Sequence, residues 1–141
     1  MPKMTDKQSM IANMAPVLQP GVFVFCSVIN RDMAFDALSE ARAMFVEDEG
    51  FSLILPRSEA DRMGLSYDMR MRQITLMVFS ALEGVGLTAA VAEVLEKERI
   101  PTNIVAATLH DHLFVPSDRA DDAMKALRAL QHAAQASARG G

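Results

Sequence analysis

Residues 74–116 read "ITLMVFSALEGVGLTAAVAEVLEKERIPTNIVAATLHDHLFVP" and contain the patterns of several successive secondary-structure elements. Apolar and polar side chains alternate from Arg72 to Ser80, which predicts a strand. Residues 87–99 place their apolar side chains on one face at helical spacing, which predicts an amphipathic helix. Two short apolar runs follow, at 102–109 and 113–116, and are expected to pair as a hairpin. The predicted order is therefore strand, loop, helix, strand, strand.

A long helix is expected to follow this segment. Ser117 or Asp118 is a suitable N-cap, and Asp121 and Asp122 lie where carboxylates favour the positive end of a helix. Residues 135–141 are small and polar, and we expect them to form a flexible tail.

A short internal repeat indicates that the chain contains two related units. "LILPRSEAD" at 53–61 aligns without a gap with "LFVPSDRAD" at 113–121. Both copies have the order strand, proline, helix start, and they predict two units of about 60 residues each. Each unit would be a strand, a connection, two strands and a helix, which is the core of an α+β ferredoxin-like fold with antiparallel sheets and helices on one face.

The first unit has the weaker signals. Residues 20–29 are almost wholly apolar, which favours a strand covered on both faces, and an acidic turn at residues 48–50 joins two further strands. Residues 30–41, where a full helix belongs, are only weakly helical. We hypothesise that an N-terminal helix within residues 4–14 covers the resulting gap. The expected division is an N-terminal helical extension (1–16), a degenerate unit (17–66), a second unit (67–134) and the tail (135–141).

Composition excludes several functions. The formal net charge is −4 and no basic run is present, which argues against nucleic-acid binding. No apolar stretch approaches the roughly 20 residues that span a bilayer, and the N-terminus lacks the apolar core of a signal peptide, so we expect no membrane association and a cytoplasmic location. Cys26, the single cysteine, is expected to be buried in a strand, and no metal or cofactor is expected.

The segment "ITLMVFSALEGVGLTAAVAEVLEKERIPTNIVAATLHDHLFVP" resembles an ACT domain, the small regulatory module of aspartate kinases and other amino-acid-controlled enzymes. With "PGVFVFCSV" and "EGFSLILPRSEAD", the whole chain resembles small stand-alone tandem ACT proteins of bacteria. The resemblance implies a ligand site, commonly an amino-acid site, at an interface between modules. It assigns this site to the loop Ser80–Thr88 of one module and to a strand residue, here Asn103, of its neighbour.

The residues themselves are compatible with such a site. Gly84, Val85 and Gly86 lead into a helix that begins near Leu87 and Thr88, where backbone N–H groups lack partners and attract a carboxylate. The amide of Asn103 could bind the other end of the ligand, and the ligand ammonium group would need a carboxylate, for which Glu83 and Asp111 are candidates. Two alternatives remain open: the glycines only shape a turn, or Asn103 only faces solvent.

The sequence "HDH" at 110–112 has three interpretations. Asp111 favours a turn, which would place His110 and His112 on opposite arms of a tight hairpin as structural or exposed residues. His110 and Asp111 could instead contact a ligand. A metal or catalytic role is the third interpretation, although no third histidine or cysteine lies nearby in sequence to complete a zinc site.

No nucleophile, phosphate-loop or zinc-protease motif is present. The leading hypothesis is therefore a non-enzymatic regulatory module that binds a small molecule, which by resemblance is an amino acid, and forms a homodimer. The alternative is an adaptor that binds another protein and has a vestigial pocket. A small enzyme using His110, Asp111 and His112 is the third hypothesis.

Overall fold

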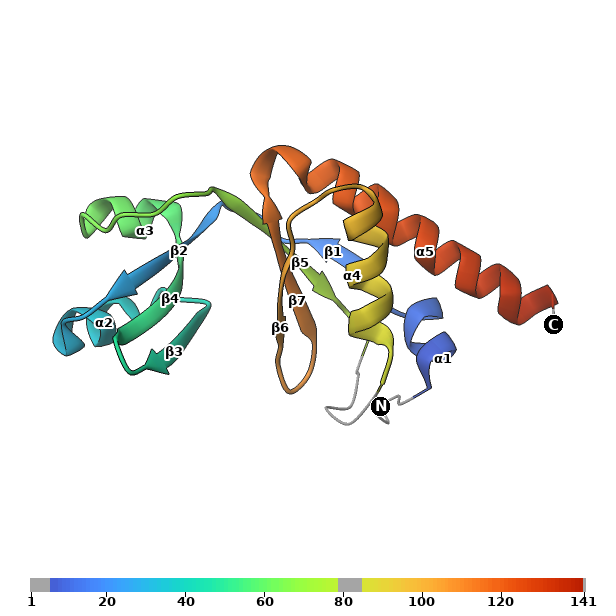
Figure 1. The fold of residues 1–141 in the computed structure, drawn as a ribbon, viewed down its shortest axis with the longest axis horizontal. Helices are drawn as coiled ribbons and strands as arrows, with labels where there is room; N and C mark the ends of the chain where they lie inside the picture. Colours follow the sequence, from blue (N-terminus) through green and yellow to red (C-terminus); the bar gives the residue numbers. More distant parts are fainter. Residues whose placement is uncertain (1–5, 79–84, 141) are drawn as a thin grey trace. The chain divides into compact units, whose positions relative to one another are not determined.

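The computed structural model describes residues 6–78 and 85–140, with side chains up to Ser137 (Figure 1). The chain forms two compact units. The inserted unit is Gly21–Met71, and the terminal unit combines Met1–Pro20 with Arg72–Gly141. The division differs from the expected one, because the N-terminal residues belong to the same unit as the C-terminal half.

The described part of the chain contains helices and strands in the order expected for two ferredoxin-like repeats. In chain order they are α1 Lys7–Ala12, β1 Pro16–Leu18, β2 Phe23–Val28, α2 Arg31–Ala37, β3 Ala43–Glu47, β4 Gly50–Pro56, α3 Arg57–Arg62, β5 Met71–Leu76, α4 Leu87–Lys97, β6 Asn103–Ala106, β7 Asp111–Pro116, the 3₁₀ turn η1 Ser117–Arg119, and α5 Ala120–Gly140.

The inserted unit has an antiparallel sheet in the order β3-β4-β2, with its core on the side of α2 and α3. The side chain of Asn30 caps α2 by accepting a hydrogen bond from the Met33 amide at 2.9 Å, so the weakly helical segment does form a short helix. Cys26 is buried, as predicted, and burial raises its pKa. The prediction that this strand is covered on both faces was wrong, because Phe25 and Ser27 are exposed on the other face.

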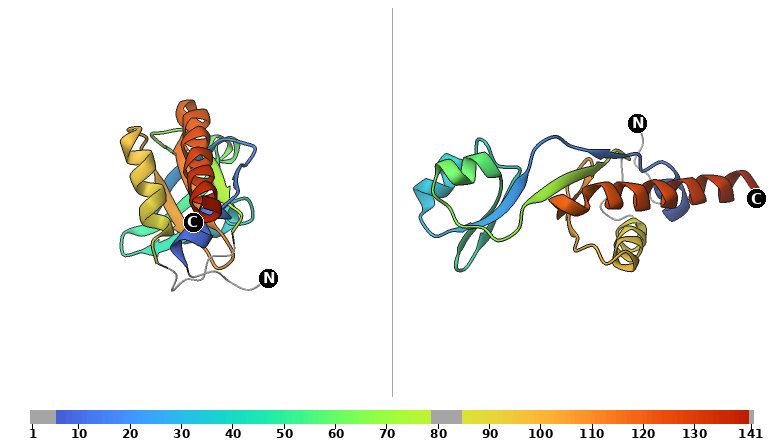
Figure 2. Two further views of the ribbon diagram at one scale, coloured as in Figure 1. Left: turned by 90° about the vertical axis from the view of Figure 1, so that its right-hand side faces the viewer. Right: turned by 90° about the horizontal axis from the view of Figure 1, so that it is seen from above.

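The terminal unit has its sheet in the order β1-β5-β7-β6, and α4 and α5 cover one face of it (Figures 1 and 2). Ile74 and Leu76 of β5 point into the core on that face, while Gln73 and Thr75 point to the helix-free face. β5 ends at Leu76, which pairs with Pro16 at the start of β1, and the predicted end at Ser80 lies outside the described residues. The strand order and the helices on one face confirm the predicted ferredoxin-like fold.

The helix α1 packs in the terminal unit and not in the inserted one. Met10, Ile11 and Met14 are buried with side chains of β5, α4 and α5. The side-chain amides of Gln131 and Gln135 on α5 each donate to the Ala12 carbonyl at 3.0 Å. The hypothesis that this helix covers a gap in the first unit was therefore wrong. Gln135 is the first residue of the expected tail, and the helix α5 continues from it to Gly140, so the tail is helical to that point.

The internal repeat is confirmed by backbone geometry. Pro56 has φ −54° and ψ 135°, and Pro116 has φ −53° and ψ 137°, so the chain leaves both strands in the same way. Ala60 and Ala120 are buried at equivalent positions after the turn. Ser117 and Asp118, the expected caps of the last helix, lie within the 3₁₀ turn η1, whose own N-cap position is Pro116, without a side-chain hydrogen bond.

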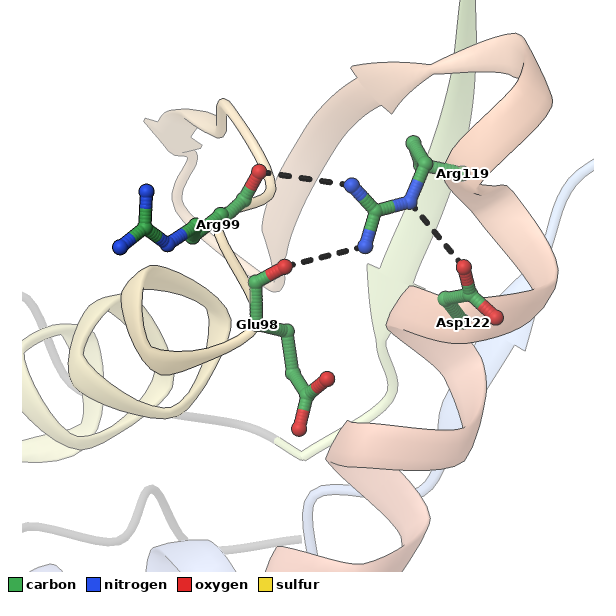
Figure 3. Close-up of polar contacts among 4 residues, drawn as sticks. All are labelled: Glu98, Arg99, Arg119 and Asp122. Carbon is green, nitrogen blue, oxygen red and sulfur yellow. Dashed lines mark hydrogen bonds and ion pairs between the residues drawn. The ribbon is translucent and has the colours of Figure 1, made fainter.

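Arg119 joins the end of α4 to the start of α5 (Figure 3). Its guanidinium donates to the carbonyls of Glu98 at 3.0 Å and Arg99 at 3.4 Å, and its Nε donates to the Asp122 carboxylate at 3.0 Å. A cation at this position pairs with the unsatisfied carbonyls and the negative end of the α4 dipole. These hydrogen bonds fix the C-terminal end of α4 against the start of α5 and so help to position the whole helix, including its start at Leu87.

Replacing Met10 by alanine tests whether α1 is part of the core. Met10 is 0% exposed, and Met10→Ala should lower the free energy of unfolding by about 2–5 kcal/mol through lost burial and a cavity. Met33, on α2, is 38% exposed, and the same change there should cost less than about 1 kcal/mol. Urea unfolding of both variants measures the difference, and equal costs would show that α1 is not packed as described.

Candidate functional site

The helix α4 begins with backbone N–H groups that have no acceptor within the helix. Gly86, the N-cap residue, has φ +105°, and no side chain caps the helix. The Gly86 carbonyl accepts the first helical hydrogen bond, from Ala90 at 3.0 Å, which leaves the amides of Leu87 and Thr88 without a helical acceptor. These N–H groups and the positive end of the helix can bind an anion.

The side chain of Lys7 lies over Gly86. A Cβ atom built on Gly86 would be 2.7 Å from Cδ and 2.9 Å from Cγ of Lys7. The stem of Lys7 therefore fills the space beside the glycine, and its ammonium group, two bonds beyond Cδ, lies near the positive end of α4. The Lys7 ammonium group and the positive end of the helix dipole repel each other. An anion bound between them would remove this repulsion.

Three of the residues expected at this site, Ser80, Glu83 and Gly84, lie outside the described part of the chain. Val85 is described and its side chain is exposed. Leu87 is buried in the core of the terminal unit, so that only its backbone amide can serve a ligand. Thr88 follows on the exposed side of the helix.

The hairpin turn does not lie at Asp111, and that prediction was wrong. Ala106 pairs with Asp111, and the Ala107 amide donates to the His110 carbonyl at 3.1 Å, so the turn is residues 107–110. Asp111 is the first residue of β7, and His110 and His112 lie on the same side of the turn rather than on opposite arms. The sequence "ATLH" has no glycine, proline, asparagine or aspartate, so turn chemistry wrongly favoured the neighbouring aspartate.

Asp111 is a buried residue, only 7% exposed. Alternation along β7 places it on the same face as Leu113 and Val115, which is the face that α4 covers. No described residue donates a hydrogen bond to the Asp111 carboxylate or forms an ion pair with it. Burial raises the pKa of Asp111, and the nearby histidines His112 and His110 oppose that rise. Figure 1 shows the hairpin turn and the start of α4 at the same end of the terminal unit.

Asn103 lies apart from these groups within one copy of the chain. It is the exposed first residue of β6 and pairs with Phe114, so it is at the end of the hairpin remote from the turn. The next residue, Ile104, packs against the core, which places Asn103 on the helix-free face. Asn103 can therefore meet a ligand near Gly86 only if it belongs to another copy.

His112 belongs to a polar cluster on the helix-free face. Its Nδ1 lies 3.0 Å from the Thr75 hydroxyl and 3.1 Å from the Gln73 amide nitrogen, and the Gln19 amide donates to the same hydroxyl at 3.1 Å. Gln73 and Thr75 are buried. Sequence reasoning missed this cluster, although the alternation of Gln73 and Thr75 with Ile74 and Leu76 was a signal that one face of β5 is polar.

The remaining features of the described residues concern metal ligands, membrane-spanning helices and surface grooves. Among the residues that the structure describes, no three histidine, cysteine, aspartate or glutamate side chains are grouped as metal ligands. No described helix is both long and apolar enough to cross a membrane. Described residues of the terminal unit line at least two grooves. The first, between α4 and β6, includes Glu96 and Ile104. The second, which we call the α5 groove, lies between α5 and β1.

Comparison with known proteins identifies the class. Two family models, each described as an ACT domain, match residues 4–72 and 70–129. The chain belongs to the ACT domain family, whose members are regulatory modules. No curated protein matches.

Three solved structures show the extent of the similarity. A protein of unknown function from Vibrio cholerae, described as a possible transport protein, is 36% identical, with 88% of this chain and 94% of that chain covered and a TM-score of 0.79. A protein from Agrobacterium tumefaciens is 15% identical over 82% and 87% of the two chains, with a TM-score of 0.64. The ligand-free regulatory subunit of aspartate kinase from Thermus thermophilus is 9% identical over 84% and 97%, with a TM-score of 0.63. The last two share the fold.

Substituting Gly86 tests the contact with Lys7. Gly64 also has positive φ, +69°, but nothing lies within 4 Å of a Cβ there, so Gly64→Ala should cost only the backbone strain, about 1–2 kcal/mol. Gly86→Ala should lower the free energy of unfolding by at least about 1 kcal/mol more, because the new methyl group overlaps the lysine stem. In a Lys7→Ala background this excess should shrink. An unchanged excess in that background would show that Lys7 does not lie over Gly86.

Burial of Asp111 should make stability depend on pH. Because the folded-state pKa is raised above the ordinary value of 3.8, the folded protein holds the proton more tightly than the unfolded chain does. The free energy of unfolding should therefore fall as the pH rises from about 4 towards neutrality. Asp111→Asn should remove this component and unfold at higher denaturant concentration than the wild type at pH 7. A variant less stable than the wild type at pH 7 but not at pH 4 would contradict the assignment.

Proposed function

We propose that this chain is a non-enzymatic regulatory module that binds an amino acid where α4 begins and β7 begins. The observation that carries the proposal is the buried Asp111 carboxyl group, to which no described residue donates. A buried carboxylate without a partner is unfavourable, and a ligand ammonium group is the complementary partner.

The other end of the ligand is accommodated by the same region. A ligand carboxylate would accept hydrogen bonds from the amides of Leu87 and Thr88 and would lie between the positive end of α4 and the ammonium of Lys7. Cation and anion binding groups at one end of the unit correspond to the two charges of an amino acid. The sequence-derived residues Ser80, Glu83 and Gly84 stay part of this proposal as the loop that precedes the helix.

Self-association completes the proposed site. Asn103 faces away from α4 in its own copy, so the role that the family resemblance assigns to it, and any role of His110 at a shared interface, requires a second copy. A homodimer contains this second copy, and its two-fold symmetry gives a closed assembly. The short strand β1 and the strand β6, at the two edges of the terminal sheet, are edges open to such pairing.

A protein-binding adaptor is the second candidate function. It is favoured by the exposed apolar side chains of β3, where Phe45 is 71% and Val46 is 66% exposed. As consecutive strand residues they point to opposite faces of β3, and large exposed apolar side chains of this kind are typical of interaction surfaces. In this reading the groups at the start of α4 have no ligand.

A thermal-shift screen with the standard amino acids tests the proposal. At a hundredfold excess over Kd, a ligand that binds only the folded protein adds about 2.7 kcal/mol to its stability. One or a few amino acids should raise the melting temperature of the wild type and of Asp36→Asn, an exposed carboxylate on α2 that serves as the control. Asp111→Asn should fold and show no shift. A shift that persists in Asp111→Asn excludes the ammonium site, and no shift with any amino acid favours the adaptor.

A further inference from the structure

The α5 groove is lined by both basic and apolar side chains. Leu18 of β1 and Met124 of α5 form part of its lining. Lys125, Arg128 and His132 lie along it on one side of the helix, at spacings of three and four residues. Neither Lys125 nor Arg128 has an ion pair with a residue that the structure describes. Asp121 is the one acid in the lining, so the groove is suited to an acidic partner that also has apolar side chains.

The hairpin of β3 and β4 in the inserted unit has the complementary chemistry. Its tip, which we define as residues 45–49, reads Phe-Val-Glu-Asp-Glu. Glu47 pairs with Gly50, so Asp48 and Glu49 form a two-residue turn that projects from the strands. The Ser52 hydroxyl donates to the Glu47 carboxylate and fixes that side chain. Asp48 and Glu49 have no ion pair with any described residue.

The exposed apolar side chains of this hairpin adjoin its acids. Phe45 and Glu47 share one face of β3, because side chains two positions apart point the same way. Phe45 is the side chain most suited to lie against Leu18 and Met124, while the acids of the turn reach the row of basic residues. The acids of the hairpin tip are therefore complementary to the basic side chains of the α5 groove, and Phe45 is complementary to its apolar side chains.

We propose that the hairpin tip of one copy of this chain docks in the α5 groove of a second copy. The two surfaces belong to different units of the same sequence, so each copy offers both. Two copies related by a two-fold axis make the contact twice and close as a dimer. This contact is a different route to self-association from pairing at the edges β1 and β6, and it does not depend on ligand binding at α4.

The two components of the contact have different roles. Exposed ion pairs contribute little affinity, but opposite charges select the partner and speed association. The apolar contact of Phe45 supplies the affinity that the charges lack. Dimer formation should therefore weaken with added salt, and charge reversal on either surface should weaken it further, because like charges then face each other.

Two charge-reversal variants test the docking. The hairpin variant is Glu47→Lys with Glu49→Lys, and the groove variant is Lys125→Glu with Arg128→Glu. Sedimentation velocity over a concentration series should show each variant alone dissociating at least about tenfold more readily than the wild type. The control Asp36→Lys with Glu40→Lys makes the same change of charge in the inserted unit and should dimerise like the wild type. Circular dichroism and thermal melting establish that each variant is folded.

Mixing the two variants gives the decisive result. In a mixed dimer the lysine-bearing tip of one copy faces the glutamate-bearing groove of the other, and the two native surfaces face each other in the second contact. Both contacts are then complementary, so an equimolar mixture should form heterodimers, which native mass spectrometry detects. A mixture that stays monomeric overturns the inference, as does wild-type behaviour of either variant alone.

Two further outcomes separate this inference from the proposed function. If the wild type dimerises but neither reversal matters, the dimer uses another surface, and this inference fails while self-association stands. If the wild type is monomeric throughout the concentration series, the docking and the self-association both fail. An amino-acid thermal shift in that monomer would leave ligand binding at α4 intact.

Discussion

Burying the carboxyl group of Asp111 is unfavourable by itself, because the charged form loses its hydration and no described residue replaces it. The position follows from the register of the hairpin: with Ala106 paired to Asp111, every second residue of β7 faces the helices, and Asp111 is the first of them. A shift by one residue would turn Asp111 to the helix-free face and Leu113 out of the core. The apolar packing of Leu113 and Val115 therefore holds a polar group where it is least solvated.

The start of α4 depends on a second constraint, the left-handed conformation of Gly86. Only glycine adopts this conformation without strain, and only glycine leaves room for the stem of Lys7. The N-terminal helix thus contributes to the core through Met10 and Met14 and to the candidate site through Lys7. The start of α4, where we propose that the ligand binds, is partly covered by Lys7 of the same chain, which makes Lys7 a candidate partner for the ligand carboxylate.

Much of the fold could be predicted from sequence, and the misses have physical causes. Periodicity predicted α4, and the aligned prolines Pro56 and Pro116 predicted the repeat, because both signals are local. The position of α1 depends on contacts with α5, more than one hundred residues away, and no local pattern encodes such a partner. The turn of the hairpin was misplaced because the register, set by the core face of β7, prevailed over the turn preference of Asp111.

The candidate site was predictable only in part. Glycines before an amphipathic helix indicated the proposed anion-binding end. Asp111 was among the candidates for the ammonium group, although it was expected in the hairpin turn and lies at the start of β7. The contribution of Lys7 and the polar cluster around His112 depend on pairings between distant segments, which composition and spacing do not reveal.

The most direct test is a nuclear magnetic resonance titration of the Asp111 side-chain carboxyl carbon, with and without the amino acid that gives the largest thermal shift. The account predicts a pKa above the ordinary 3.8 in the free protein and a fall in that pKa when the ligand is bound, because an ammonium group favours the carboxylate. A pKa that does not change with saturating ligand would contradict the claim that Asp111 binds the amino acid.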